Sequence, residues 1–440
     1  MSRDTLTVTD SRSGQTYLLP IENTTIRATD LQKIKTGPEN HGLATYDPAF
    51  LNTASCRSSI TFMDADHGIL RYRGYPIEVL AECHSFLDIA YLLSFGELPH
   101  GAERESWVSE ITHHTMLDET AKHCMEGFLR DAHPMATLVS TLSALSTLYP
   151  EAHDVCDPSN RLRQIKRIVA KVPSIAAISY RHSLGYPYVP PDNDLSYTEN
   201  FMNMLWKMVE PKYMANIVLA HALNTLFILH ADHGQDCSTN IMRCVGSAQS
   251  DPYLTTAAAS AAFAGPLNGG AIEEVFKMIE GIGSRQNVPA FIKEVKETRG
   301  KLAGFGDRVY TNNDPRVQIL KRTAEQVFDV TGRDSKVEIA LELERIALED
   351  DFFVIRRLYP NVSFYSAMIY QAMGFRREMA TVLLAIPRTA GWLAHWHEML
   401  SDPEQEMAQP RQIYAGREQR ELPPSELHAV VESEAGSWAC

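Results

Sequence analysis

Long apolar segments with helical spacing, which begin near Ser85, constrain the fold of this chain more than any other feature of its sequence. They include SFLDIAYLLSF, TLVSTLSALSTLY, YMANIVLAHALNTLFILH and SKVEIALELERIALEDDFFVIRRL. Apolar residues recur in them every three to four positions, which places these side chains on one face of an α-helix. Because such faces must be buried against other elements, the sequence predicts a mostly α-helical protein.

The first 30 residues follow a different pattern. LTVTDSRSGQTYLLPI alternates apolar and polar residues on both sides of a Ser-Gly pair, which predicts a small β-hairpin. Clusters of proline and glycine at 186–193, 265–270 and 281–289 are expected to interrupt the later helices. No segment repeats with a period of roughly 20 to 50 residues, so the sequence does not predict a solenoid.

Composition limits the classes of function. The 440 residues are 44% hydrophobic and 22% charged, as in a globular protein with room for two domains. A net charge of -14 argues against nucleic acid as a partner. The 7 cysteines contain no CxxC pair, so neither a zinc ribbon nor a disulfide framework is expected, and reduced thiols fit an intracellular protein.

Neither terminus carries a recognisable address. The opening residues, MSRDTLTVTDSRSGQ, are polar, and no stretch approaches the roughly 20 apolar residues of a membrane span. The closing SWAC matches neither a peroxisomal nor an ER-retention signal. We therefore expect a cytoplasmic protein with no membrane partner.

Two short motifs could bind an anion, although each also has an ordinary structural interpretation. HADH sets His230 and His233 three residues apart, on one face if the segment is helical. A third ligand is not evident, so no metal site is expected. GFGDRVYTNNDPR joins a glycine turn to Asp307, Arg308 and Arg316, which suits an anion or a phosphate, but most such turns are only turns.

Two further motifs carry basic residues near helix ends. LYPNVSF follows Arg356 and Arg357, and a charged helix end before proline is usually a stop signal. IPRTAGWLAHWHEM places Arg388 before a segment rich in tryptophan and histidine, where aromatic spacing more often marks a core than a binding site.

These motifs occur together and in one order that resembles the citrate synthase family over nearly the whole chain. The resemblance rests on TASCRSSITFMDADHGILRYRGYPIEVLAE, FILHADHGQDCST, GPLNGGA, GFGDRVYTNNDPR, ELERIALED, LYPNVSFYSAM, PRTAGWLAHW and PRQIYAG. It implies a mostly α-helical homodimer in which a large and a small domain enclose the active site. The N-terminal β appendage is similar to that of the bacterial-type and some fungal branches.

The same resemblance implies domain boundaries. Residues 1–45 would form the β appendage, 46–275 together with 378–440 the large helical domain, and 276–377 the small helical domain.

In this family, an aspartate and two histidines join acetyl-CoA to oxaloacetate, and all three positions differ in this chain. The histidine of GPLHGG, which stabilises the enolate oxygen, corresponds to Asn268. The histidine of GFGH, an acid for the keto oxygen, corresponds to Asp307, and the aspartate of PNVDF, the base, corresponds to Ser363.

Other positions implied by the resemblance contact the ligands. The residues that match oxaloacetate-binding positions are His230, His233, Arg316 and Arg388. The arginine of RPR, which the family supplies across the dimer, is replaced by Gln409. The candidate CoA contacts are backbone groups at Gly304 and Gly306 and the side chains of Arg356 and Arg357.

The substitutions predict changed chemistry. Ser363 has no group able to accept a carbon-bound proton, Asn268 retains a neutral hydrogen-bond donor, and Asp307 brings a carboxylate that could act as a relocated base. We therefore expect a diverged enzyme that acts on a citrate-like acid or an acyl-CoA outside central metabolism, without ordinary citrate formation and without a tightly bound cofactor.

Two alternatives remain open at this stage. One is a non-catalytic paralogue that binds metabolites or forms heterodimers, which the three substituted positions favour. The other is a residual citrate or alkylcitrate synthase that uses Asp307 as its base.

Overall fold

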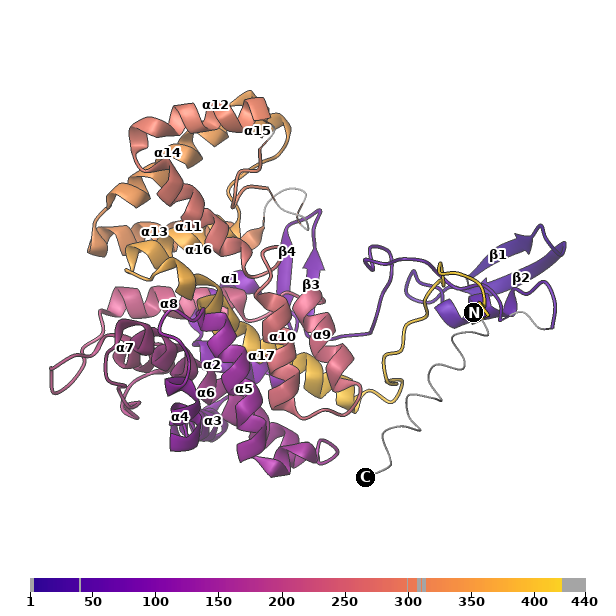
Figure 1. The fold of residues 1–440 in the computed structure, drawn as a ribbon, viewed down its shortest axis with the longest axis horizontal. Coiled ribbons are helices and arrows are strands. Elements are labelled where there is room, and N and C mark those ends of the chain that lie inside the picture. Colours follow the sequence, from indigo (N-terminus) through magenta and orange to yellow (C-terminus); the bar gives the residue numbers. More distant parts are fainter. Residues whose placement is uncertain (1–3, 39–40, 299, 307–309, 311–313, 422–440) are drawn as a thin grey trace, which may run out of the picture.

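A computed structural model describes residues 4–38, 41–298, 300–306, 310 and 314–421, and its architecture is mostly helical, as predicted (Figure 1). The predicted N-terminal hairpin is present. Strands β1 (Thr5–Asp10) and β2 (Gln15–Pro20) pair in antiparallel fashion, and Gly14 provides the positive φ of 73° that the turn requires. The hairpin stands apart from the helical body (Figure 1).

A second sheet was not predicted from the sequence. Strands β3 (Thr61–Asp64), β4 (Ile69–Tyr72) and β5 (Tyr75–Pro76) form an antiparallel sheet in that order. Leu70 and Tyr72 of β4 are buried against the helical body, which makes this sheet part of the frame around the site described below.

Ten α-helices of the described residues precede the glycine-rich turn at 265–270. Their bounds are α1 Ile77–Cys83, α2 Phe86–Phe95, α3 Gly101–His113, α4 Glu119–Glu126, α5 Pro134–Leu148, α6 Pro158–Leu184, α7 Tyr197–Trp206, α8 Ile217–His230, α9 Cys237–Gly246 and α10 Pro252–Phe263. Several begin at a polar cap, as expected from their sequences. Ser85 forms a capping box with Asp88 at the start of α2, and Asp251 caps α10.

The last helix, α17 (Ala380–Ser401), runs through the middle of these helices and packs against α2, α6, α8, α9 and α10. Its buried Trp392 and Trp396 fill the core at this crossing. Because α17 touches so many partners, it fixes where its polar residues stand relative to α8 and α9.

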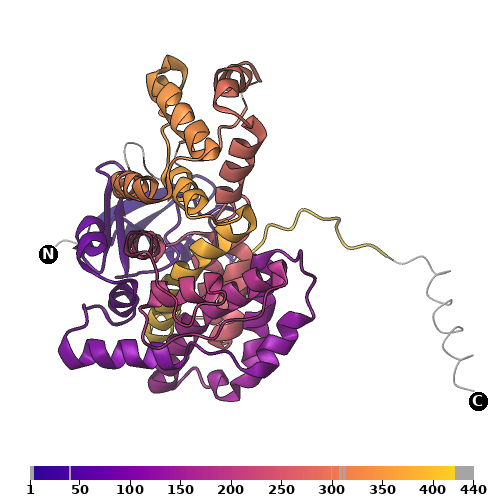
Figure 2. The ribbon, with the colours of Figure 1, turned by 90° about the vertical axis from the view of Figure 1, so that its left-hand side faces the viewer.

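The remaining helices gather at one end of the molecule (Figures 1 and 2). They are α11 Ala271–Ile282, α12 Val288–Thr298, α13 Pro315–Thr331, α14 Ser335–Glu349, α15 Asp351–Ile355 and α16 Val362–Ala372. The short 3-10 helices are η1 Ala28–Lys33, η2 Pro150–His153, η3 Arg285–Asn287 and η4 Arg377–Met379. The domain boundaries stay a prediction, but α13 packs on α8 and α11 on α17, which joins this end to the main body.

After α17 the chain leaves the helical body and returns toward the hairpin (Figure 1). There Arg27 Nη2 lies 3.0 Å from Glu404 Oε1. None of the helices in the described part of the chain is long and apolar enough to cross a membrane.

Candidate functional site

The two histidines of HADH do not share a helix face, contrary to one interpretation of their spacing. Helix α8 ends at His230, and His233 lies in the loop that follows. His230 Nε2 is 2.9 Å from Ser366 Oγ of α16. His233 Nε2 is buried and has no hydrogen-bond partner among the described residues. The end of α8 thus carries an imidazole whose Nε2 is paired, and the loop after it carries one whose Nε2 has no partner among the described residues.

Two arginines from distant segments meet at the end of α8. Arg316 Nη1 donates to the carbonyl of Leu229 at 3.4 Å, and Arg388 Nε donates to the carbonyl of His230 at 3.1 Å. Because the last carbonyls of a helix lack partners within the helix, cationic side chains stabilise this end. Capping α8 therefore also brings both guanidinium groups beside the histidines.

Each arginine has a carboxylate partner. Arg316 Nη2 lies 2.5 Å from Asp314 Oδ2, and Arg388 Nη1 lies 2.6 Å from Asp236 Oδ2. Burial opposes the charge of Arg316, but the charge and hydrogen bonds of Asp314 outweigh this cost and raise the arginine pKa. Both arginines are nearly fully buried, so these charges act in a medium that screens them weakly.

The histidines are held neutral. Burial is the main cause that lowers the pKa of His230 and of His233 well below the usual value, and the charges of Arg316 and Arg388 act in the same direction. A neutral imidazole can still donate one hydrogen bond without adding a cation. The arrangement suits an anionic ligand that also carries a neutral oxygen acceptor.

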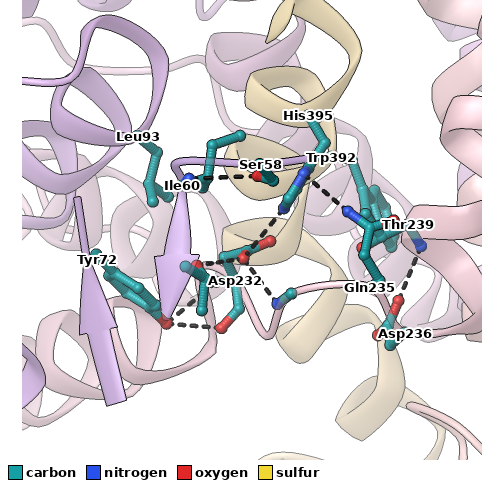
Figure 3. Close-up of polar contacts among 12 residues, drawn as sticks. Ser58, Ile60, Tyr72, Leu93, Asp232, Gln235, Asp236, Thr239, Trp392 and His395 are labelled. Atoms are coloured by element: carbon teal, nitrogen blue, oxygen red, sulfur yellow. Dashed lines mark hydrogen bonds and ion pairs between the residues drawn. The ribbon is translucent and has the colours of Figure 1, made fainter. Parts of the chain in front are cut away.

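A buried network around Asp232 holds the loop between the histidines (Figure 3). Asp232 Oδ2 accepts hydrogen bonds from Thr61 Oγ1 at 2.6 Å and Gly234 N at 2.9 Å, and it lies 3.3 Å from His395 Nε2. The hydroxyl of Tyr72 donates to the Asp232 carbonyl at 2.7 Å. Burial opposes ionisation of Asp232, but interactions with His395, Arg388 and Thr61 lower its pKa, so it stays a carboxylate.

This network was not predicted from the sequence. Its members come from β3, from β4, from α17 and from the loop that follows α8. Of these, only the Asp between the two histidines of HADH belongs to a motif recognised in the sequence. By fixing that loop from three sides, the network fixes the position of His233.

Asn268 lies on a tight turn between α10 and α11. Its backbone N donates to the carbonyl of Gly265 at 2.9 Å, and a Cβ on Gly269 would overlap the ring of Phe263. The guanidinium carbon of Arg388 lies 5.2 Å from the centre of that same ring. Asn268 Nδ2 is buried and has no hydrogen-bond partner among the described residues. The turn thus holds a donor without a partner among the described residues, and it packs on the same ring that Arg388 contacts.

The glycine turn 304–306 is joined to the start of α16. Asn361 N donates to the carbonyl of Gly304 at 2.8 Å, and Asn361 Nδ2 donates to the carbonyl of Gly306 at 2.8 Å. Ser363 N donates to Asn361 Oδ1 at 3.0 Å, so Ser363 stands in the first turn of the helix that also carries Ser366. Asp307 lies outside the described residues.

The other predicted contacts lie farther out. Arg357 lines a cavity of about 250 Å³ together with Gly306 and Asn361, whereas Arg356 is exposed and stacks over Phe352 at 4.0 Å. Gln409 is exposed and follows α17. Figure 1 shows that the segment after α17 leaves the helical body. The described residues contain no His, Cys, Asp and Glu group suited to hold a metal ion.

Comparison with known proteins supports the resemblance. Residues 49–411 match the family described as "Citrate synthase, C-terminal domain". A peroxisomal citrate synthase of Dictyostelium discoideum is 50% identical over 94% of this chain and 86% of its own length. A glyoxysomal citrate synthase of Cucurbita maxima is 46% identical over 96% of this chain and 84% of its own length.

Solved structures agree. The citrate synthase of Pyrobaculum aerophilum superposes with a TM-score of 0.78 at 30% identity, covering 87% of this chain and 97% of that one. The citrate synthase of Thermoplasma acidophilum, solved as a ternary complex with carboxymethyl coenzyme A and oxaloacetate, gives a TM-score of 0.77 at 27% identity. It covers 85% of this chain and 97% of that one. These matches confirm the predicted fold class.

The comparisons also correct the predicted function. The expectation of a diverged reaction other than ordinary citrate formation, outside central metabolism, is wrong, because relatives that match nearly the whole chain at 46% to 50% identity are citrate synthases. The same matches speak against a non-catalytic paralogue.

Proposed function

The chain belongs to the citrate synthase family, and on this premise we propose that it joins acetyl-CoA to oxaloacetate to form citrate and free CoA. The observation that carries the proposal is the buried grouping of Arg316 and Arg388 with the neutral His230 and His233. Two guanidinium groups suit the carboxylates of oxaloacetate, and a neutral imidazole suits its keto oxygen.

The reaction has two stages, condensation and hydrolysis. A base removes one proton from the methyl group of acetyl-CoA, and the resulting enolate carbon forms a bond to the keto carbon of oxaloacetate. The keto oxygen takes up a proton. Water then attacks the thioester carbonyl of the condensed product, the C–S bond breaks, and CoA leaves as a thiol while citrate is released.

We assign the enolate donor to Asn268. Negative charge develops on the thioester oxygen when the methyl proton leaves, and a donor already aimed at that oxygen stabilises the charge without reorganisation. Asn268 Nδ2 is such a donor, because it is buried and unpaired among the described residues. Its turn is packed on Phe263, next to Arg388, which would place the two substrates side by side.

We assign the keto oxygen to His233. Its Nε2 is unpaired, whereas Nε2 of His230 is occupied by Ser366. With Nε2 protonated in the neutral ring, His233 donates to the keto oxygen and makes the keto carbon more electrophilic. Asp232 and its partners hold the loop so that this donor keeps its direction.

The proton acceptor is assigned to Asp307. Ser363 occupies the position of the family base but offers only a hydroxyl, which cannot accept a carbon-bound proton near pH 7. Asp307 follows directly on the glycine turn that Asn361 ties to the first turn of α16. A carboxylate there would replace the one missing at 363.

The proposed oligomeric state and CoA contacts are those that the family resemblance implies. The protein would act as a homodimer in which Gln409 reaches the partner's site, and it would bind CoA only as a substrate, with no tightly bound cofactor. Backbone groups at Gly304 and Gly306 and the side chains of Arg356 and Arg357 would contact the CoA portion. Cytoplasmic location stays a prediction, and two relatives named for peroxisomes or glyoxysomes make cell fractionation its test.

The decisive experiment follows CoA release and citrate formation from acetyl-CoA and oxaloacetate, with purified protein. Thiol release that depends on both substrates, together with citrate identified by mass, supports the proposal. Asp307→Asn should then lower kcat by about 10² to 10⁴, as expected for loss of a general base. Thiol release no faster than without protein would refute citrate formation.

A further inference from the structure

Asp236 occupies a position where a ligand carboxylate would bind Arg388. It caps α9: Oδ1 accepts from Thr239 N at 2.8 Å and from Ser238 Oγ at 2.6 Å. The other oxygen, Oδ2, accepts from Arg388 Nη1 at 2.6 Å. One carboxylate oxygen therefore holds the helix and the other neutralises the arginine.

The hydrogen bonds of Arg388 engage Nε and Nη1, two of the three nitrogens of its guanidinium group. A guanidinium binds a carboxylate best through two parallel N–H groups on one edge. On the edge formed by Nε and Nη2, Nε already donates to the carbonyl of His230 at 3.1 Å. On the edge formed by Nη1 and Nη2, Nη1 already donates to Asp236. Only the second edge can be freed without disturbing the end of α8.

Arg316 is bound more firmly by its own carboxylate. Its Nε donates to Asp314 Oδ1 at 2.9 Å, and its Nη2 donates to Asp314 Oδ2 at 2.5 Å, so one full edge is occupied. Asp314 is buried and also caps α13 through Arg316 N, which ties it to its position. Arg388 is therefore the arginine at which an incoming carboxylate can exchange places with a protein carboxylate.

We propose that Asp236 is an affinity-determining residue that competes with the substrate carboxylate for Arg388. The inference rests on the proposed function in taking oxaloacetate as the ligand. A second carboxylate that approaches Arg388 must displace Asp236 or lie beside it, and repulsion between like charges is strong where solvent is excluded. Free protein in which Arg388 is already neutralised binds the dianionic keto acid less tightly than the arginine alone would allow.

Asp236→Asn tests this proposal directly. The amide oxygen can still accept from Thr239 N and Ser238 Oγ, because asparagine is as good an N-cap as aspartate. The negative charge at Arg388 is removed, so the Kd of oxaloacetate measured by calorimetry, and its KM, should fall by about tenfold or more. Asp236→Ser, which also caps helices well, should lower both values in the same direction. Structural damage would instead weaken binding.

Two controls isolate the mechanism. Asp118 caps α4 at an exposed position with a bond to Thr120 N at 2.7 Å, so Asp118→Asn makes the same charge change away from the site and should leave Kd unaltered. In an Arg388→Gln background, Asp236→Asn should give no gain, because the shared partner is missing.

The outcomes separate this inference from the proposed function. Equal or weaker oxaloacetate binding in both Asp236 variants, with unchanged unfolding midpoints, overturns the inference, as does the absence of oxaloacetate binding in every form of the protein. Binding that tightens in the variants while no form releases CoA would refute citrate synthesis and leave the competition at Arg388 intact.

Discussion

Replacing Asn268 with leucine tests whether its buried amide serves the structure or the reaction. Asn268 Nδ2 is buried without a partner among the described residues, so folding removes it from water and returns no hydrogen bond there. An unpaired buried donor of this kind costs about 1–3 kcal/mol. Leucine is close in size and has no donor, so the variant should be more stable than the wild type by about 1 kcal/mol.

The expected effect on catalysis has the opposite sign. If Asn268 donates to the enolate oxygen, its loss should lower kcat by about 10² to 10³, which corresponds to about 2.7–4 kcal/mol of transition-state stabilisation. Asn268→His, which restores the family's donor at this position, should keep or raise kcat. A leucine variant that is more stable and less active would show that Asn268 lowers stability in favour of activity, which a structural asparagine does not do.

Both quantities are accessible in one set of samples. Urea unfolding gives the free energy of unfolding for the wild type and the two variants, and thiol release from acetyl-CoA with saturating oxaloacetate gives kcat. A leucine variant that loses more than about 1 kcal/mol of stability would show that Asn268 makes a structural bond. Unchanged kcat in that variant would refute its role as the enolate donor.

Three further predictions concern other described residues. Ser363→Asp should raise kcat by about 10² in the thiol-release assay, because it places a carboxylate at the family's base position and aspartate is favoured in a first helical turn; an unchanged rate would show that 363 does not face the methyl group. Gly269→Ala should lower the free energy of unfolding by about 1–3 kcal/mol in urea, since its Cβ would overlap the Phe263 ring, and wild-type stability would contradict this packing. Burial opposes ionisation of Asp88, but hydrogen bonds from Arg104 and the helix cap lower its pKa. The contribution of Asp88 to folding stability is therefore present above its unfolded pKa near 3.8 and is lost as pH falls through its folded pKa. Asp88→Asn should flatten the fall in stability below pH 4, and a pH profile identical to that of the wild type would rule this contribution out.

Similarity over the whole chain was a better guide to function than the motif positions alone. Compared with the family's motifs by sequence alone, Asn268, Asp307 and Ser363 favour a diverged reaction. In the structure, Asn268 Nδ2 is a buried donor without a partner among the described residues, so this substitution does not remove a hydrogen-bond donor from the position.

Local sequence determined the parts of this protein that depend on neighbouring residues. The helical spacing, the hairpin around Gly14 and the break between α10 and α11 follow from side-chain periodicity and from turn residues. The resemblance also named His230, His233, Arg316 and Arg388 as binding residues, and the structure brings these four together.

Tertiary structure decided how those residues are paired. Several contacts join segments that are far apart in the chain: Asp236 binds Arg388, Tyr72 and His395 hold Asp232, and Ser366 occupies His230 Nε2. His233 Nε2 stays without a partner among the described residues. No local pattern encodes these contacts, because they arise only when packing of the apolar helix faces brings α8, α13, α16 and α17 to one place. Burial at that place makes an unpaired charge or donor energetically costly. This cost favours the pairing of buried polar groups, and the sequence alone does not specify which groups pair.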